Sequence, residues 1–314
     1  MAKFYLSVWL RQKGDSLVAL LPRWFFRAFL KTFKTHPELA EQVGFHVHPR
    51  SFDSPLPLME EIDAAKLAEP RVLPGIDLRV ASALTLLGEL RLFAGELDRF
   101  PYDRDGQSPF WFSNKSFTDF DAAVLYSMLR RLKPRRYIEL GCGFSSVISS
   151  EAIKRNEQDG IQCDAAYCDP DPRLPMTALA CGRFVRNRVQ DLPLEMFTQL
   201  AQGDVLFIDT SHVMKIQSDV EYELLRILPS LRPGVWIQVH DIFTPYDYPE
   251  DWVFRPLRLG VNEQYALECL LTGGKRYQVE LPVHYLVRHH LKEMQELFPR
   301  GKQRGQSLWL KKME

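Results

Sequence analysis

Acidic residues, histidines and glycines stand where four apolar segments of the sequence end. The four ends read Glu139-Leu-Gly-Cys-Gly, Cys-Asp169-Pro, Asp209-Thr-Ser-His212 and His240-Asp241. A carboxylate beside an apolar segment is costly unless it is solvated, paired or bound to a ligand, and a histidine exchanges protons near neutral pH. These ends therefore have the groups that polar-ligand binding and acid–base catalysis require.

The first end, IELGCGFSS at residues 138–146, has the character of a ligand-binding turn. Gly141 and Gly143 allow the backbone to turn sharply and to pass close to a ligand. A dinucleotide site would have a third glycine where Ser146 stands, and Glu139 would repel a pyrophosphate. A carboxylate here suits a cationic ligand such as S-adenosylmethionine, which carries a sulfonium and an ammonium. A purely structural turn is the alternative.

Two further acids follow the second and third predicted strands. Asp169 could accept hydrogen bonds from both hydroxyls of a ribose, and Asp191 would lie near an adenine in a nucleotide-binding sheet. The alternatives are a turn carboxylate before Pro170 and a cap of the helix that follows Asp191.

The last two ends are expected to face each other, because the strands that carry them are neighbours in this type of sheet. Asp209 and Asp241 with waters would then suit Mg²⁺, which would lower the pKa of a substrate hydroxyl. His212 is our candidate for the catalytic base, with Asp241 beside it. The alternatives are a surface histidine and an aspartate that caps a turn.

The elements that would position these residues alternate between apolar strands and helical segments after residue 110. Strands are expected at 136–140, 165–169, 184–190, 204–209, 234–241, 276–283 and 307–313. The predicted fold class is α/β: a Rossmann-like, seven-stranded, mostly parallel sheet with an antiparallel edge strand. Ligands of such sheets bind beyond the carboxyl ends of the strands, where the candidate residues lie. We expect residues 1–110 to form a mainly helical extension and residues 111–314 the catalytic domain.

Composition limits the function classes. The chain has 314 residues, with 40 Lys and Arg against 40 Asp and Glu, so its formal net charge of zero argues against a nucleic-acid-coating protein. Its five cysteines are odd in number and include no CxxC pair, which disfavours a disulfide framework. No apolar stretch is long enough to span a bilayer, and no signal-peptide cleavage site is visible. We therefore predict a cytoplasmic protein with no nucleic-acid partner.

Residues 17–34 predict a basic, aromatic helix near the start of the chain. Arg23, Arg27 and Lys31 recur every four residues, and phenylalanines fill much of the same turns. Such a helix could lie on the anionic inner face of a membrane as a peripheral contact. It could equally pack on the main domain or form a homodimer contact, which is the interpretation we favour.

The same motifs resemble those of a known family. The ExGxG turn, the acid after the second strand and the two closing strands resemble class I S-adenosylmethionine-dependent methyltransferases. The stretches FIDTSHVMKIQSDVEYELLRILPSLRPGVWIQVHDIFTPYDYP and NEQYALECLL resemble, more specifically, a bacterial methyltransferase-domain subgroup. The resemblance covers about residues 111–312, with Ser145 in place of the usual third glycine.

The resemblance implies roles for individual residues. The implied cofactor residues are Glu139, Gly141, Gly143 and Phe144 at the methionine end, Asp169 at the ribose, Asp191 near the adenine, and Asp209 near the methionyl amine or a metal. Metal-dependent relatives place acids after strands 4 and 5, which Asp209 and Asp241 match. His240 stands where another oxygen ligand would be expected.

The predicted activity is S-adenosylmethionine-dependent methyl transfer, by direct in-line displacement, to an oxygen of a small molecule or saccharide. Alignment of the two reactants would supply part of the lowering of the barrier. A non-catalytic, methyltransferase-like binding subunit is one alternative. A nicotinamide-dependent oxidoreductase is another, which Glu139 and the missing third glycine disfavour. The sequence does not reveal the methyl acceptor.

Overall fold

The computed structural model describes residues 22–42, 44, 51–52, 54, 56–117, 119–254, 260–302 and 305–314. The chain divides into two compact units, Met1–Ile62 and Asp63–Glu314. Residues 63–110 therefore share one compact unit with the predicted catalytic domain. The functional boundary near residue 110 stays a prediction.

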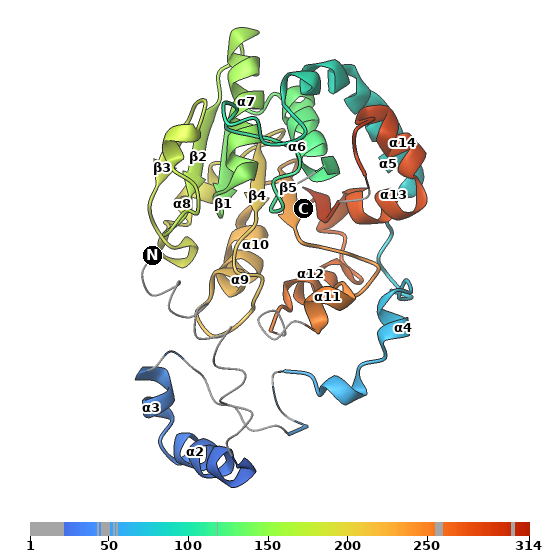
Figure 1. Cartoon of the computed structure of the whole chain (residues 1–314). Helices are drawn as coiled ribbons and strands as arrows, with labels where there is room; N and C mark the ends of the chain where they lie inside the picture. Colours follow the sequence, from blue (N-terminus) through green and yellow to red (C-terminus); the bar gives the residue numbers. More distant parts are fainter. Residues whose placement is uncertain are drawn as a thin grey trace. The chain divides into compact units, whose positions relative to one another are not determined.

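Seven strands form one sheet in the order β3-β2-β1-β4-β5-β7-β6 (Figure 1). The strands are β1 (Arg136–Leu140), β2 (Asp164–Cys168), β3 (Arg183–Val185), β4 (Val205–Ile208), β5 (Trp236–His240), β6 (Tyr277–Pro282) and β7 (Ser307–Lys312). Strands β1 to β5 pair in parallel, whereas β7 lies antiparallel between β5 and the edge strand β6. The Rossmann-like fold class is thereby confirmed, with the antiparallel pairing at the predicted end of the sheet.

The register of the central strands brings their carboxyl ends to one edge. Leu140 pairs with both Cys168 and Ile208, and Ile208 pairs with Val239. The residues that follow these positions therefore leave the sheet side by side. This is the edge at which parallel α/β sheets bind ligands.

Helices cover both faces of the sheet (Figure 1). In the second unit the helices are α4 (Ala64–Leu67), α5 (Val80–Leu90), α6 (Asp119–Leu132), α7 (Phe144–Gln158), α8 (Glu195–Thr198), α9 (Asp219–Tyr222), α10 (Leu228–Ser230), α11 (Glu250–Val253), α12 (Glu263–Leu271), α13 (Val283–His289) and α14 (Leu291–Leu297). Alternate strand residues enter two apolar cores: Tyr137 and Phe207 face α5, α6, α7, α13 and α14, whereas Ile138 and Ile208 face α8, α9, α10 and α12.

Two helical segments are interrupted. The segment 219–230 contains a π-helical turn at Glu223–Ile227, just before Pro229, which lacks the N–H that a regular helix requires. The segment between β6 and β7 forms two helices, α13 and α14, because His290 between them leaves the helical conformation, with φ of −134° and ψ of 40°.

Residues 63–110 pack into the second unit through apolar and charged contacts. Leu86, Leu87 and Leu90 of α5 belong to the core on one face of the sheet. Arg71 pairs with Glu268 of α12, with nitrogen–oxygen distances of 2.9 and 2.6 Å. This segment therefore covers the sheet that carries the candidate site.

The first unit contains α2 (Arg23–Thr35), α3 (Pro37–Gln42) and a short 3₁₀ helix at Met59–Glu61. Helix α2 begins directly after Pro22 and covers most of the helix predicted at 17–34, of which residues 17–21 lie outside the described residues. Trp24 is 68% exposed, and Leu30 and Lys31 are also exposed. No helix in the described part of the chain has the length and apolarity needed to cross a bilayer.

Candidate active site

Four ionisable side chains meet where β4 and β5 end. His212 Nε2 lies 3.2 Å from Asp209 Oδ1 and 3.3 Å from Asp241 Oδ2. His240 Nδ1 lies 3.6 Å from the same Asp209 oxygen and 3.4 Å from Asp241 Oδ1. Two imidazoles thus share two carboxylates, and the structure brings together the candidates that the two strand ends predicted.

The backbone is strained at two of these residues. His212 and Asp241 have φ angles of 59° and 58°, in the left-handed region that residues other than glycine rarely adopt. The start of α12 holds the first loop in place, because the backbone N–H groups of Asn262 and Glu263 both donate to the carbonyl of His212. Strain that the surrounding structure maintains in this way is typical of functional sites.

An outer pair of carboxylates orients the two imidazoles. Glu263 Oε2 lies 2.9 Å from His212 Nδ1, and Asp121 Oδ2 lies 3.6 Å from His240 Nε2. Asp121 is itself fixed, because it accepts hydrogen bonds from the backbone N–H of Gln306 and from the Ser307 hydroxyl. Each histidine therefore faces the cluster with one ring nitrogen and an outer carboxylate with the other.

The electrostatics of the cluster favour charged side chains despite burial. Burial opposes the imidazolium form of His212, but Asp209, Glu263 and Asp241 raise its pKa well above the usual range. His240 behaves in the same way, with Asp241 and Asp209 as the main opposing charges. The pKa of Asp209 is lowered, because the two histidines outweigh the effect of its burial. The surrounding carboxylates therefore favour the protonated form of both histidines.

Behind His212 lies a second pair of buried acids. Burial and the charge of Glu263 raise the pKa of Glu223 well above its ordinary value. Burial likewise raises the pKa of Glu263, against the lowering effect of His212. Glu223 accepts a hydrogen bond from Thr210, so this pair connects the loop after β4 to the π-helical turn.

The two glycines of the turn after β1 meet different requirements. Gly141 has φ of 84°, and an added Cβ would lie 1.8 Å from the backbone oxygen of Asp209. Gly143 has extended φ of −165°, and an added Cβ there would have no atom within 4 Å. Gly141 is therefore required by the fold itself, whereas the space beside Gly143 is open.

Glu139 has four protein partners. Its fully buried carboxylate accepts hydrogen bonds from Tyr137 at 2.6 Å, from Ser145 and Ser146 at 2.7 Å, and from Ser149 at 3.0 Å. Burial raises its pKa to about 7, although these hydrogen bonds act in the opposite direction. Glu139 thus anchors the start of α7 to β1, and its predicted contact with the cofactor stays a prediction.

Asp169 connects two turns at the carboxyl edge of the sheet. Its Oδ2 accepts a hydrogen bond of 2.8 Å from the backbone N–H of Cys142, and its Oδ1 accepts one of 2.6 Å from that of Asp171. The side chain therefore lies directly beside the Gly141–Gly143 turn, which is the neighbourhood that a ribose-binding acid would need.

The remaining cofactor candidates lie around the same edge. Asp191 is exposed and forms a two-point ion pair with Arg188, at 2.6 and 3.0 Å. Phe144 is half-buried and packs edge-on against Trp111, with ring centroids 4.7 Å apart. Their predicted roles near the adenine and the methionine end stay predictions.

The aromatic segment after β5 forms a small core. Phe243, Tyr246, Tyr248 and Trp252 are all buried and contact one another. Gln264 organises the segment, since it accepts from the Phe243 N–H and donates to the Tyr246 carbonyl. These side chains pack the loop that follows Asp241.

Sequence reasoning missed the outer acids Asp121 and Glu263. Glu263 shares the buried face of α12 with Leu267 and Leu271, at intervals of four, and Asp121 lies in α6, where residues 119–130 are all buried. A buried carboxylate requires a polar partner. An acid at the spacing of the buried leucines was therefore the signal in the sequence that Glu263 has such a partner.

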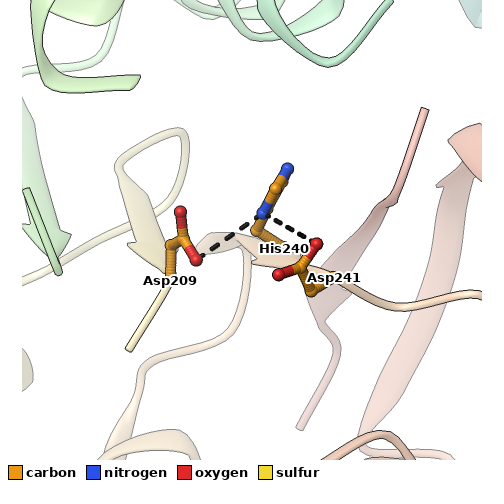
Figure 2. Close-up of side chains that lie close together, drawn as sticks. All are labelled: Asp209, His240 and Asp241. Carbon is orange, nitrogen blue, oxygen red and sulfur yellow. Dashed lines mark ion pairs between the residues drawn. The ribbon is translucent and has the colours of Figure 1, made fainter. Parts of the chain in front are cut away.

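Three of the clustered residues form a candidate metal site (Figure 2). One donor atom from each of Asp209, His240 and Asp241 lies within 4.8 Å of the other two. Figure 2 shows the two carboxylates on either side of the nearer ring nitrogen of His240. The donor set fits a divalent cation, because buried carboxylates require positive charge and neither His240 ring nitrogen has a hydrogen bond.

Comparisons with known proteins show similarity to a methyltransferase domain over part of the chain. Residues 138–242 match a family described as a methyltransferase domain. An uncharacterized protein of Archaeoglobus fulgidus is 26% identical over 175 residues, which cover 52% of this chain and 77% of that protein.

Several solved structures are similar at low identity. CmcI with SAH is 16% identical with a TM-score of 0.39, covering 70% of this chain and 91% of that one. CalS11, a TDP-rhamnose 3′-O-methyltransferase of calicheamicin biosynthesis, is 12% identical with a TM-score of 0.41, covering 71% and 93%. MycE with Mg, SAH and mycinamycin VI is 12% identical with a TM-score of 0.35, covering 74% and 54%.

The family match spans β1, β2, β3, β4 and β5, the strands whose carboxyl ends carry the glycine turn, Asp169 and the charged cluster. The predicted seven-stranded, mostly parallel sheet with antiparallel pairing at one edge is present. Residues 138–242 of the chain are therefore similar to a methyltransferase domain and form the parallel part of a Rossmann-like sheet.

Proposed function

We propose that the enzyme methylates a hydroxyl oxygen of a small molecule or saccharide. The observation that carries the proposal is the partly buried cluster of His212, Asp209 and Asp241, which lies at the same sheet edge as the glycine turn. A hydroxyl must lose its proton as it attacks the sulfonium methyl, and a histidine held by carboxylates suits that task.

The cofactor would lie across the ends of β1, β2 and β4. The proposed contacts are Glu139, Gly141, Gly143 and Phe144 for the methionine end, Asp169 for the ribose, Asp191 for the adenine and Asp209 for the methionyl amine. Support comes from the open space beside Gly143 and from the contact between Asp169 and the glycine turn. Asp191 would need to leave its pair with Arg188 to reach the adenine directly.

His212 and Asp241 would handle the acceptor proton. Glu263 fixes the imidazole through Nδ1, so Nε2 is the atom that would accept the proton. A divalent cation, for which Mg²⁺ is the ion predicted from two carboxylates, would be held by Asp209 and Asp241 and would lower the pKa of a bound hydroxyl. In that state two of the three carboxylates that raise the pKa of His212 would be bound to the cation, and only Glu263 would still act on the imidazole.

The decisive experiment compares wild type with His212→Ala. Isothermal titration calorimetry with S-adenosylhomocysteine should give similar affinities for both proteins. Methyl transfer from labelled S-adenosylmethionine to a panel of sugars, sugar nucleotides and phenols should fall about 10²–10⁴-fold in the variant. Equal turnover would refute the role of His212, and failure of wild type to bind S-adenosylhomocysteine would refute the proposed function.

Helix α2 would supply a contact surface of the first unit. Trp24 and Leu30 are exposed beside the exposed cations Arg27 and Lys31, and Arg23–Thr35 includes no acid. We propose that this surface contacts a second copy of the chain, with an anionic membrane as the competing partner. Light scattering and liposome co-sedimentation, with and without residues 1–34, distinguish the two: loss of dimer supports the proposal, and loss of liposome binding alone refutes it.

A further inference from the structure

The buried imidazole of His240 gives the cluster at the ends of β4 and β5 a mixed set of donors. We infer that Asp209, His240 and Asp241 bind a divalent transition-metal ion, with Zn²⁺ as the best match, in preference to Mg²⁺. The inference rests on the proposed methyl-transfer site and concerns which ion that site selects.

His240 is the residue that changes the expected ion. Its ring is 3% exposed, yet neither ring nitrogen has a hydrogen bond. Nδ1 instead points between the two carboxylates, at 3.6 and 3.4 Å (Figure 2). These contacts are longer than ordinary hydrogen bonds, and a metal ion between the ring and the two carboxylates would satisfy all three groups together.

The chemistry of the donors separates the candidate ions. Mg²⁺ takes oxygen ligands and keeps several waters, so an imidazole nitrogen is a poor substitute for one of its oxygens. Imidazole suits Zn²⁺, Fe²⁺ and other transition metals, which also accept carboxylates. One nitrogen with two carboxylates therefore favours the transition metals.

The spacing of the donors points in the same direction. Ligand atoms about 2.1 Å from a tetrahedral Zn²⁺ lie roughly 3.4 Å apart, whereas neighbouring ligands of an octahedral Mg²⁺ lie roughly 2.9 Å apart. The two distances from His240 Nδ1, 3.6 and 3.4 Å, are closer to the tetrahedral value. His212 shares the same carboxylates and stays available for the acceptor proton.

The surroundings of His240 are those of a metal-binding histidine. Asp121 lies 3.6 Å from Nε2, and ligating histidines commonly direct their distal N–H to a carboxylate that fixes the ring. The ring of Phe117 lies 4.9 Å from that of His240 between their centroids. The imidazole is thus oriented toward the cluster before any ion binds. A site that used only oxygen ligands would not require an oriented imidazole.

Titration of the full chain with single metals tests the inference. Protein stripped with EDTA is titrated calorimetrically with ZnCl₂, MnCl₂ and MgCl₂, without S-adenosylmethionine. Zn²⁺ should bind at one site at least about 100-fold more tightly than Mg²⁺, and the affinity for Mn²⁺ should lie between the two. Affinity for Mg²⁺ equal to that for Zn²⁺ would overturn the inference.

Variants assign the effect to His240. His240→Glu, which gives the site three oxygen donors, should weaken Zn²⁺ binding by at least about tenfold. The ratio of Zn²⁺ affinity to Mg²⁺ affinity should fall as a result. Asp121→Asn should weaken Zn²⁺ binding about tenfold or more through the loss of the carboxylate that orients the ring. His290→Gln, which changes a histidine paired with Glu293 on the surface, is the matched control and should change nothing. Unchanged Zn²⁺ affinity in His240→Glu would overturn the assignment.

Two further readouts keep the test independent of folding and of catalysis. If His240→Glu fails to fold, the visible absorption of Co²⁺-loaded wild type decides: intense tetrahedral bands support the inference, and weak octahedral bands overturn it. Calorimetry with S-adenosylhomocysteine on metal-free protein tests the cofactor site separately. Cofactor binding without Zn²⁺ selectivity would refute only this inference, and Zn²⁺ selectivity without cofactor binding would refute only the proposed function.

Discussion

The turn after β1 and the cluster after β4 and β5 lie at the same sheet edge but are built by different means. The turn is set by the backbone and by hydroxyl groups: Gly141 has φ of 84°, and three serines of α7 hydrogen-bond Glu139. The cluster is set by charges that α6 and α12 hold in place through Asp121 and Glu263. A turn defined by its backbone leaves a local motif in the sequence, whereas a site assembled from distant helices does not.

The largest expected effect separates the two glycines of the turn. Gly141→Ala places a Cβ 1.8 Å from the Asp209 backbone oxygen at a positive φ, so we expect a loss of at least about 3 kcal/mol in the free energy of unfolding, or failure to fold. Gly143→Val should unfold like wild type but bind S-adenosylhomocysteine at least about tenfold more weakly, because its side chain enters open space. Urea denaturation and calorimetry measure both effects.

The control for this pair is Gly88→Ala in α5, where an added Cβ also has no atom within 4 Å. This variant should be at least as stable as wild type and should bind S-adenosylhomocysteine with the same affinity. Wild-type stability in Gly141→Ala would contradict the structural requirement, and wild-type affinity in Gly143→Val would contradict the placement of the cofactor.

A smaller effect should appear in the pH dependence of stability through Glu139. Its pKa rises from an ordinary value of 4.5 to about 7 in the folded protein, chiefly through burial. The folded state therefore binds more protons than the unfolded state, so the contribution of Glu139 to stability is complete below pH ~4.5 and is lost as the pH rises to ~7. The full difference corresponds to roughly 3 kcal/mol.

Glu139→Gln should remove this dependence while keeping an oxygen that the hydroxyl groups can reach. Urea denaturation between pH 4 and pH 8 compares the two proteins, and the difference between their unfolding free energies should change with pH over this window. A difference that does not change with pH would show that Glu139 keeps an ordinary pKa. The network around Glu139 would then hold a charged carboxylate, as the cluster after β4 and β5 does.

The fold could be predicted because both faces of a parallel sheet are buried. Continuous apolar runs such as VLFI at 205–208 therefore stand out between helical segments. The third strand is shorter than predicted, Arg183–Val185 instead of 184–190, because it lies at the edge of the sheet and pairs only with β2. The π-helical turn depends on tertiary packing that local periodicity does not contain.

The site could be predicted only where strand order determines which residues are neighbours. Asp209 and Asp241 lie close together because β4 and β5 are neighbouring strands. Asp169 lies beside the glycine turn because β1 and β2 are neighbouring strands. The partners Asp121 and Glu263 come from helices whose angle and depth on the sheet depend on the whole core. Their contacts with His240 and His212 could not be derived from spacing alone.

The smallest effect tests the part of the site that the sequence did not reveal. Glu263 contacts His212 Nδ1 at 2.9 Å and is a positioning residue, so Glu263→Gln should lower kcat about 10–100-fold while leaving KM and S-adenosylhomocysteine affinity nearly unchanged. Glu268→Gln, a buried acid on the same helix that pairs with Arg71, is the matched control and should leave kcat of the folded protein unchanged. Because Glu263 acts through His212, adding Glu263→Gln to His212→Ala should reduce kcat no further. An additive loss in the double variant would mean that Glu263 acts on the reaction independently, and the contrast between a backbone-defined turn and a cluster oriented from outside would no longer hold.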